Sequence, residues 1–521
     1  MLGRFRWMIV CLLLTGAACA RSAPAGGELH YGLTLAPTGI DPHINASSEL
    51  GIPLASVYDT LVFRDDKGGF VPGLAQHWDV SPDGRQYTFS LRRDVRFQDG
   101  TPFNAQAVKV NLERILDPAN RSQKARFMID AVQSAVVLDD YTVRLDLDEP
   151  FAPLLDSLSQ VYLGMASPAA LEKWGMDYQF HQVGTGPFRF VEYVPGDHLT
   201  LERNPDYAWA PSIYRNKTAQ LSRIVFRFYA DPSTRAPALL SGEADVMGEV
   251  LPRDAENLEQ DGRFAVFPVN IPGQPLQFFF NGNLPPTDDI LVRQALLAAT
   301  DRESIVRTVF GSYSPVATGP LTASSWGASP VIPADSFDRG KANALLRQAG
   351  WVDSNNDGVR EKNGHALRLK VVYPSWGLTP QVADLLEMQW KEAGVAVELT
   401  QVPSFSALVG AQTGGAYHLI SMNLAGTDPD LMRSFYRSGS MYNWTGINNA
   451  RLDSLLDGAA RVGTDRERLD AYREIQTELA SQFVLLPIRD YVNVNVALRR
   501  VKGLHFSAQG WFPILIDVSL N

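Results

Sequence analysis

Cysteine is scarce in this chain and confined to one end. Among 521 residues the only cysteines are Cys11 and Cys19, both close to the N-terminus. A disulfide needs two cysteines in the folded body, so the sequence predicts a fold without any disulfide. The eight histidines are scattered, with no HxH, HExxH or cysteine-paired spacing, and the pattern therefore does not indicate a catalytic zinc site.

Basic charge, long apolar runs and catalytic motifs are also lacking. Lys and Arg number 47 against 57 Asp and Glu, which gives a net charge of −10 and argues against a nucleic-acid binder. No run of about 18 apolar residues follows the N-terminal segment, so no membrane span is expected. There is no GxSxG elbow and no GKS or GKT loop. An enzyme has no positive support, and an extracellular hydrolase is only a remote alternative.

The length and composition are those of a soluble globular protein with more than one domain. Hydrophobic residues make up 45% and charged residues 20% of the chain. At 521 residues the chain is too long for one core and suggests two or three domains.

The first residues form an export signal. Arg4 and Arg6 precede an apolar stretch over 7–14, and small residues then lead to Cys19. A small-residue run ending in cysteine resembles a bacterial lipoprotein cleavage site, where the cysteine becomes the acylated first residue. We therefore expect a lipoprotein-type signal over 1–19 and a tether over 20–27.

That expectation has an alternative. Gly16 stands three residues before Cys19, where leucine is usual, so an ordinary signal peptide cut near Ala20 or Ala23 remains open. On either interpretation the mature protein is periplasmic or on the cell surface. Acylation of Cys19 would anchor it to the membrane.

The most informative stretch is 73–117, where signals for a hairpin, a strand and a helix follow one another. Ser81-Pro82-Asp83-Gly84 suits a type I turn. Tyr87, Phe89 and Leu91 then alternate with polar residues, as in a half-buried strand. Asn104 follows DGTPF and is placed to cap a helix that ends near position 117.

This stretch, GLAQHWDVSPDGRQYTFSLRRDVRFQDGTPFNAQAVKVNLERILD, resembles the signature region of the family 5 extracellular solute-binding proteins. These are the receptors of peptide, nickel and opine ABC importers. GTGPFRFVEY, LERNPDY and the GEAD step resemble further stretches of the family pattern. The resemblance implies a two-lobed α/β periplasmic-binding-protein fold that closes on a solute and delivers it to a membrane permease. It also implies that the APTGIDPH loop lines the pocket.

The resemblance implies the following division of the chain: a first segment of lobe I over 28–65, an additional small subdomain over 66–184, a second segment of lobe I over 185–270, lobe II over 271–484, and a return to lobe I over 485–521. In lobe II the periodicity predicts one helix over 289–310. A strand, helix and strand over 367–399 predict a parallel α/β unit, whose ligands lie beyond the carboxyl ends of the strands.

The best candidate for the solute site is the strand end and helix start over 419–445. In peptide-binding members the corresponding run is Trp-x-x-Asp, and the resemblance implies that its Asp pairs with the peptide ammonium. Here Met422 takes the Trp place and Ala425 the Asp place. A buried ammonium needs a charged partner, so the absence of this Asp weighs against an ordinary dipeptide. Asp428 is placed to cap a helix at Pro429, which competes with a role in binding.

The candidate solute-binding residues share a position at a strand end or beside the candidate helix: Met422, Asn423, Ala425, Thr427, Asp428, Trp444, Trp376 and Asn281. The two tryptophans are equally compatible with a pocket wall and with the core.

One loop resembles a calcium site. Asp353, Asn355 and Asp357 supply oxygens at alternate positions, and Gly358 follows as in an EF-hand. The twelfth position is Gly364, so the usual bidentate carboxylate is missing, although Glu361 can contribute. A polar hairpin loop is the alternative, and otherwise no cofactor is expected.

Two solute classes stay open. The first is a short peptide or peptide-like solute held mainly by backbone and apolar contacts. The second is a non-peptide solute such as a nickel or metallophore chelate or an opine. A monomer that works with an ABC permease is expected in both cases.

Overall fold

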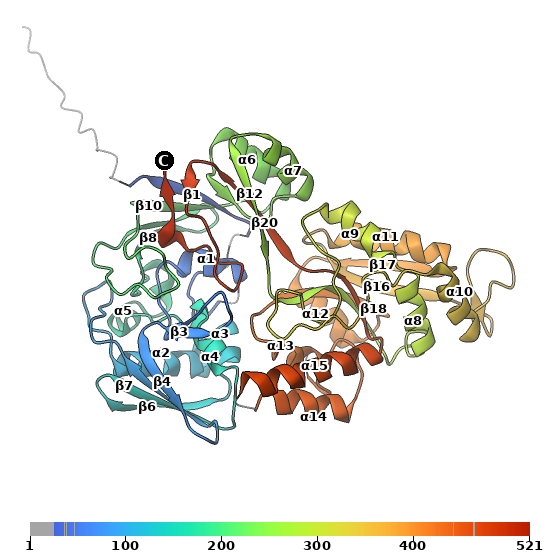
Figure 1. The fold of residues 1–521 in the computed structure, drawn as a ribbon, viewed down its shortest axis with the longest axis horizontal. Coiled ribbons are helices and arrows are strands. Elements are labelled where there is room, and N and C mark those ends of the chain that lie inside the picture. The colour runs from blue at the N-terminus through green and yellow to red at the C-terminus, as the bar shows by residue number, and fades with distance from the viewer. Residues whose placement is uncertain (1–25, 36, 38, 46, 441, 462–463) are drawn as a thin grey trace, which may run out of the picture.

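The computed structural model describes residues 26–35, 37, 39–45, 47–440, 442–461 and 464–521. The predicted signal segment and Cys19 lie outside the described residues, as does most of the predicted tether. The chain forms two lobes with a small subdomain beside the first (Figure 1). Every helix among the described residues is too short or too polar to cross a bilayer.

Lobe I is built on a seven-stranded mixed sheet of order β12-β20-β11-β1-β10-β9-β8. Its strands are β1 (Glu28–Leu33), β8 (Phe188–Val194), β9 (His198–Arg203), β10 (Arg223–Phe228), β11 (Val246–Met247), β12 (Phe264–Asn270) and β20 (Val492–Leu498). The central strand β1 is parallel to both neighbours, β10 and β11. The helices α6 (Arg235–Ser241) and α7 (Pro252–Gln260) pack on one face against the alternate valines of β20.

The small subdomain is a four-stranded antiparallel sheet with its own helices. The sheet order is β4-β5-β7-β6, with strands β4 (Ala75–Val80), β5 (Gln86–Leu91), β6 (Val132–Asp139) and β7 (Thr142–Leu147). The helices are α2 (Ala105–Leu116), α3 (Lys124–Met128), α4 (Leu154–Leu158) and α5 (Pro168–Trp174). Its core residues belong to the same continuous hydrophobic cluster as those of lobe I.

The local predictions for 73–117 are confirmed. The turn at Ser81 joins β4 to β5, and the carbonyl of Ser81 accepts a hydrogen bond from the Gly84 amide at 2.8 Å. The side chain of Asn104 caps α2 by accepting a hydrogen bond from the Ala107 amide at 3.0 Å. Turn, strand and cap need only near neighbours in the chain, which is why sequence alone locates them.

Lobe II contains a five-stranded sheet of order β17-β16-β18-β13-β19. The strands are β13 (Gly273–Phe280), β16 (Arg368–Pro374), β17 (Ala396–Val402), β18 (Leu419–Ala425) and β19 (Leu485–Arg489). β16 is parallel to β17 and to β18, as the predicted parallel unit requires. Alternate residues of these strands face two separate cores, so Phe278 packs in one and Phe279 in the other.

Eight helices cover lobe II in the described residues: α8 (Ile290–Ala298), α9 (Arg302–Phe310), α10 (Arg339–Gln348), α11 (Thr379–Glu392), α12 (Phe405–Gly414), α13 (Leu431–Tyr436), α14 (Ala450–Ala459) and α15 (Asp465–Ser481). The single helix predicted over 289–310 is wrong, because the structure breaks it into α8 and α9. The side chain of Asp301 accepts a hydrogen bond from the Ser304 amide at 2.9 Å and so starts a new helix. The apolar residues keep a helical spacing on both sides of this break, so the sequence pattern predicted one continuous helix.

The chain crosses between the lobes twice, once between β12 and β13 at 271–272 and once between β19 and β20 at 490–491. The second crossing differs from the predicted return at 485, because β19 pairs with β13 in the lobe II sheet. A fully buried run such as Leu485–Arg489 fits either sheet equally well, so its composition does not reveal its partner. The other predicted bounds stay predictions.

The remaining elements are short: α1 (Gly51–Leu54), β2 (Val62–Arg64), β3 (Phe70–Pro72), β14 (Glu361–Lys362), β15 (His365–Ala366), β21 (Val501–Lys502) and β22 (Ser519–Leu520), with 3-10 turns at Ser48–Leu50, Pro118–Asn120, Val161–Leu163, Gly175–Phe180, Pro232–Thr234 and Leu515–Asp517.

Candidate functional site

The second crossing between the lobes carries charged and aromatic side chains. The Arg489 guanidinium lies 4.1 Å from the ring centre of Phe310 and 4.5 Å from that of Tyr491. Asp490 is buried and accepts a hydrogen bond from the Ala323 amide at 2.9 Å. Burial raises the pKa of Asp490 to about 6. The crossing is therefore a packed polar junction and not a solvated linker.

The lobe I side of this junction carries two carboxylates. Glu49 is buried and accepts hydrogen bonds from the Thr34 amide at 2.9 Å and the Thr34 hydroxyl at 2.8 Å. Burial, and next the nearby charge of Glu249, raise the pKa of Glu49 to about 7. Glu249 accepts a hydrogen bond from the Tyr491 hydroxyl. Negative charge is thus concentrated beside the hinge.

Positive charge lies elsewhere in lobe I. The Lys124 ammonium lies 4.0 Å from the ring centre of Tyr162, and none of the described carboxylates pairs with it. Burial lowers the pKa of Lys124 to about 8. Burial, and next the charge of Glu49, raise the pKa of Tyr162. Lobe I therefore presents both signs of charge around Tyr162.

On the lobe II side, the junction is formed by the start of β13 and the end of β18. Ala425 lies opposite Gly273 in the antiparallel pair. A Cβ on Gly273 would lie 2.1 Å from the Leu424 carbonyl oxygen, so glycine is required there. Gln274 and Gln277 follow, and both donate their side-chain amides to the Tyr436 hydroxyl at 3.3 and 3.0 Å.

The turn after β18 joins lobe II to the small subdomain. The Thr427 hydroxyl donates to Asp156 Oδ1 at 2.6 Å and accepts from Gln160 Nε2 at 3.2 Å. Arg64 holds the same Asp156 oxygen at 2.5 Å. Close by, the Ala152 amide donates to the Ala460 carbonyl at 2.9 Å. These contacts hold the two lobes against one another.

Asp428 has a different partner from the one its sequence position indicates. Its carboxylate forms a bidentate ion pair with Arg468, with distances of 2.6 and 2.9 Å, and both side chains are buried. It also accepts a hydrogen bond from the Asp430 amide at 2.9 Å, so it does order the turn before α13. The helix nevertheless begins at Leu431, later than Pro429 predicts.

The remaining candidate residues are divided between core and surface. Met422 and Trp444 pack in one lobe II core, where the Trp444 ring is 0% exposed. Asn281 is buried and donates to the Tyr417 carbonyl at 3.0 Å. Trp376 follows β16 and is 40% exposed. Asn423 and Ala425 are half-buried at the end of β18.

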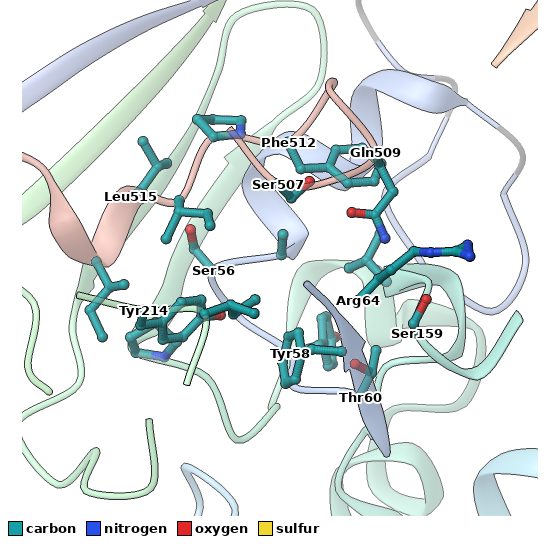
Figure 2. Close-up of a pocket in the computed structure, with 18 residues that line it drawn as sticks. Ser56, Tyr58, Thr60, Arg64, Ser159, Tyr214, Ser507, Gln509, Phe512 and Leu515 are labelled. Carbon is teal, nitrogen blue, oxygen red and sulfur yellow. The ribbon is translucent and has the colours of Figure 1, made fainter. Parts of the chain in front are cut away.

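A pocket opens within lobe I beside the hinge (Figure 2). It lies between the chain after α1, β2 and the C-terminal loop that carries Gln509 and Phe512. The side chain of Gln509 points toward Arg64, the residue that holds Asp156 (Figure 2). The Phe512 ring packs so closely on Gly51 that a Cβ there would lie 2.0 Å from it.

The APTGIDPH loop packs against the small subdomain. Asp41 forms an ion pair with Arg114 of α2 at 2.6 Å, and both side chains are mostly buried. The portion of this loop that the structure describes is therefore held by α2.

The calcium-like loop brings three carboxylates together. Oxygens of Asp353, Asp357 and Glu361 lie within 4.8 Å of one another. The Asn355 side chain instead bonds to Asp357 through both its amide nitrogen and its oxygen. Calcium binding in this loop stays a prediction.

Glu49, Glu249 and Lys124 were missed by the sequence reasoning. None of them belongs to a motif or a periodic pattern, and they come from three separate segments of lobe I and its subdomain. Only the fold brings them to one region. What they share is a buried or half-buried position without an ion-pair partner among the described residues, which composition does not reveal.

Two sheet-based lobes joined by a double crossing, with buried charge at the junction, define a hinged receptor for a small solute. The profile of the bacterial extracellular solute-binding proteins, family 5 Middle, matches residues 69–446. The chain belongs to this family, the substrate-binding proteins of ABC importers, and the predicted family and fold class are confirmed.

Relatives and solved structures of this family bind different solutes. The glutathione-binding protein GsiB of Pectobacterium atrosepticum is 29% identical over 486 residues, which cover 91% of this chain and 90% of the relative. NikA of Brucella suis, solved with Fe(III)-EDTA, is 26% identical with a TM-score of 0.86 and covers 95% of this chain and 100% of its own. DppA of Helicobacter pylori, solved with the peptide STSA, is 25% identical with a TM-score of 0.77 over 95% of this chain and 98% of its own.

Proposed function

We propose that this receptor captures a short peptide or peptide-like solute by hinge closure and passes it to a membrane permease. The observation that carries the solute class is a set of buried oxygen acceptors at the lobe junction. Asp490 Oδ1 and the side-chain oxygens of Gln274, Gln277 and Asn495 accept no hydrogen bond from any described residue. All four belong to β13, to β20 or to the crossing between the lobes.

Unpaired acceptors in a buried site favour a solute rich in N–H donors. A buried oxygen without a partner costs about 1–3 kcal/mol, which a donor on the solute can recover. Peptide bonds and ammonium groups provide such donors, whereas a carboxylate does not. The relatives that bind glutathione and a tetrapeptide support the same class.

The test is to identify what the purified protein retains. We expect mass spectrometry of solute released by denaturation to recover peptides or peptide-like compounds. Recovery of a metal chelate or of an opine would contradict the proposal. Calorimetry with the recovered compound then establishes binding.

A receptor for a metal chelate is the second candidate. It is favoured by the absence of a carboxylate at Ala425 and by the similarity to NikA with its bound chelate. The same mass spectrometry separates the two, provided that metals are measured in parallel.

We further propose that the protein has no catalytic activity, acts as a monomer and is anchored through acylated Cys19. Membership of an extracellular binding-protein family supports these proposals. Light scattering measures the molar mass in solution and so tests whether the protein is a monomer. Turnover of any recovered solute would contradict a purely receptor role. Acylation predicts a mass increase that disappears in Cys19→Ser.

A further inference from the structure

We propose that Glu49 and Glu249 form the subsite for the cationic group of the solute, an ammonium or a guanidinium. This inference rests on the proposed function, since it assigns one end of a peptide-like solute to lobe I. The end of β18 in lobe II offers no carboxylate, since position 425 is alanine. The two glutamates offer the missing negative charge from the opposite lobe.

Glu49 is a buried carboxylate without a cationic partner. It is 4% exposed, and its hydrogen bonds come from Thr34 alone. No described lysine, arginine or histidine lies within ion-pair distance of it. The charge of Arg235 acts on it weakly, as the smallest of the influences that shift its pKa. Its guanidinium, however, donates to the backbone carbonyls of Tyr229, Ala230 and Glu249.

An uncompensated buried carboxylate is costly, so such a group is held largely in its neutral form until a cation pairs with it. The cost of Glu49 is largely removed if a solute cation takes the place of the missing partner. This is the behaviour expected of a binding residue and not of a residue that serves folding.

Glu249 is held in place by an unusual backbone. Its φ is 47°, in the left-handed region, where a residue with a Cβ is strained. Its amide donates to Asn493 Oδ1 at 2.8 Å, and its carboxylate accepts from the Tyr491 hydroxyl. The strained conformation is thus fixed from β20 and presents the side chain at the hinge. No described cation forms an ion pair with this carboxylate either.

A third group points independently to a donor-rich ligand. Asn495 is 1% exposed, and its side-chain oxygen has no hydrogen-bond partner among the described residues. A Cβ on Gly248 would lie 3.3 Å from this oxygen and 3.7 Å from Asn493 Oδ1. The space beside Gly248, next to Glu249, is therefore lined by the side-chain amides of Asn493 and Asn495, with the unpaired Asn495 oxygen nearest.

Aromatic rings complete the cation site. Tyr491 and Trp511 are neighbours, with ring centres 5.8 Å apart and planes inclined by 34°. The Tyr491 ring already attracts one guanidinium, that of Arg489 at 4.5 Å, so aromatic faces here accept such groups. Carboxylates, acceptor oxygens and aromatic faces together match a cation with several N–H donors.

The experiment compares free-amine and N-acetylated probes by calorimetry. The probes are Ala-Ala, tri-alanine and glutathione with their N-acetylated forms. The proteins are the mature receptor, Glu49→Gln and Glu249→Gln. Each glutamine retains an acceptor for the existing hydrogen bonds, so the substitutions remove charge with little change in shape. Glu202→Gln, an exposed residue of β9 in the same sheet, is the matched control.

We expect at least one free-amine probe to bind the receptor at least tenfold more tightly than its acetylated form. Each glutamine variant should lose most of this preference while its affinity for the acetylated probe stays unchanged. The control should behave as the wild type. Equal binding of both probe forms to the wild type, or an equal loss for both in the variants, would overturn the subsite.

If no peptide probe binds, the proposed solute class fails and the subsite is judged separately. Thermal unfolding is then measured in ethylammonium and guanidinium chloride at millimolar concentration, against sodium chloride of equal ionic strength. Stabilisation of the wild type that both glutamine variants lose supports the cation subsite. Equal stability in all three salts overturns it.

Discussion

The unpaired charge of Glu49 should make the stability of the empty receptor depend on pH. In the unfolded chain this carboxyl releases its proton near the ordinary value of 4.5, whereas in the folded protein the pKa is raised to about 7. Between these values the folded state binds more protons than the unfolded state. The free energy of unfolding therefore decreases as pH rises.

The size of the effect follows from the two pKa values. At about 1.4 kcal/mol per pH unit, raising the pKa from 4.5 to about 7 disfavours the ionised folded protein by about 3 kcal/mol. The stability contributed by the protonated form is complete below about pH 4.5 and is lost once pH exceeds about 7. Glu49→Gln removes this dependence because glutamine does not titrate.

The assay is urea unfolding of the wild type and Glu49→Gln between pH 4 and 8, without solute. We expect similar stability at the acid end and an advantage for the variant of about 3 kcal/mol at the alkaline end. The groups that face Glu49 are Thr34, Glu249, Arg235 and the tyrosines 31, 162 and 491. Those that titrate are common to both proteins, so their contributions largely cancel in the difference.

A difference that stays constant across this pH range would refute the reasoning, because it would mean that Glu49 titrates alike in both states. An increasing advantage of the wild type at high pH would show that a cation pairs with Glu49 in the free protein. Exposed Glu202→Gln should show no pH-dependent difference.

Four further outcomes are expected. Asp428→Ala should lower the free energy of unfolding, measured in urea, by about 3–5 kcal/mol, because it leaves Arg468 buried and unpaired. Replacing both residues with apolar ones should restore much of the lost stability. Thr427→Val removes hydrogen bonds that connect lobe II to the small subdomain, each worth about 1 kcal/mol. Calorimetry should therefore show solute binding weakened by up to about tenfold, and X-ray scattering should show a larger radius of gyration for the bound protein. Asn104→Ala should cost about 1 kcal/mol of unfolding free energy through loss of the α2 cap, and a smaller loss than for Asn104→Gly would contradict this. If the 353–361 loop binds calcium, Asp353→Asn should abolish calorimetric heat on calcium titration, and heat that persists in the variant would place the ion elsewhere.

Local features were predictable from sequence because their causes are local. The turn at Ser81, the strand after it and the cap at Asn104 depend on residues within a few positions of one another. The family resemblance also predicted the fold class, which the solved structures confirm. The break at Asp301 was missed because a cap inside a continuous apolar period leaves the period intact.

The site was harder to predict because its groups meet only in the folded chain. Asp428 was recognised as a helix-start residue, but its partner Arg468 lies forty positions later. Trp444 was a plausible pocket wall, yet side-chain direction placed it in the core. Glu49 and Glu249 lie two hundred positions apart, so no pattern in the sequence connects them.

The shared core of lobe I and the small subdomain determines which regions of the receptor move. One continuous hydrophobic cluster runs through both, whereas the clusters of lobe II are separate from it. A relative displacement within a shared core would expose apolar surface, while rotation at the two crossings breaks mainly polar contacts, such as those of Thr427 with Asp156, Ala152 with Ala460 and Tyr313 with Glu259. The subdomain therefore moves with lobe I as one rigid body. A permease that recognises the closed receptor then depends on the relative position of two rigid bodies and not of three.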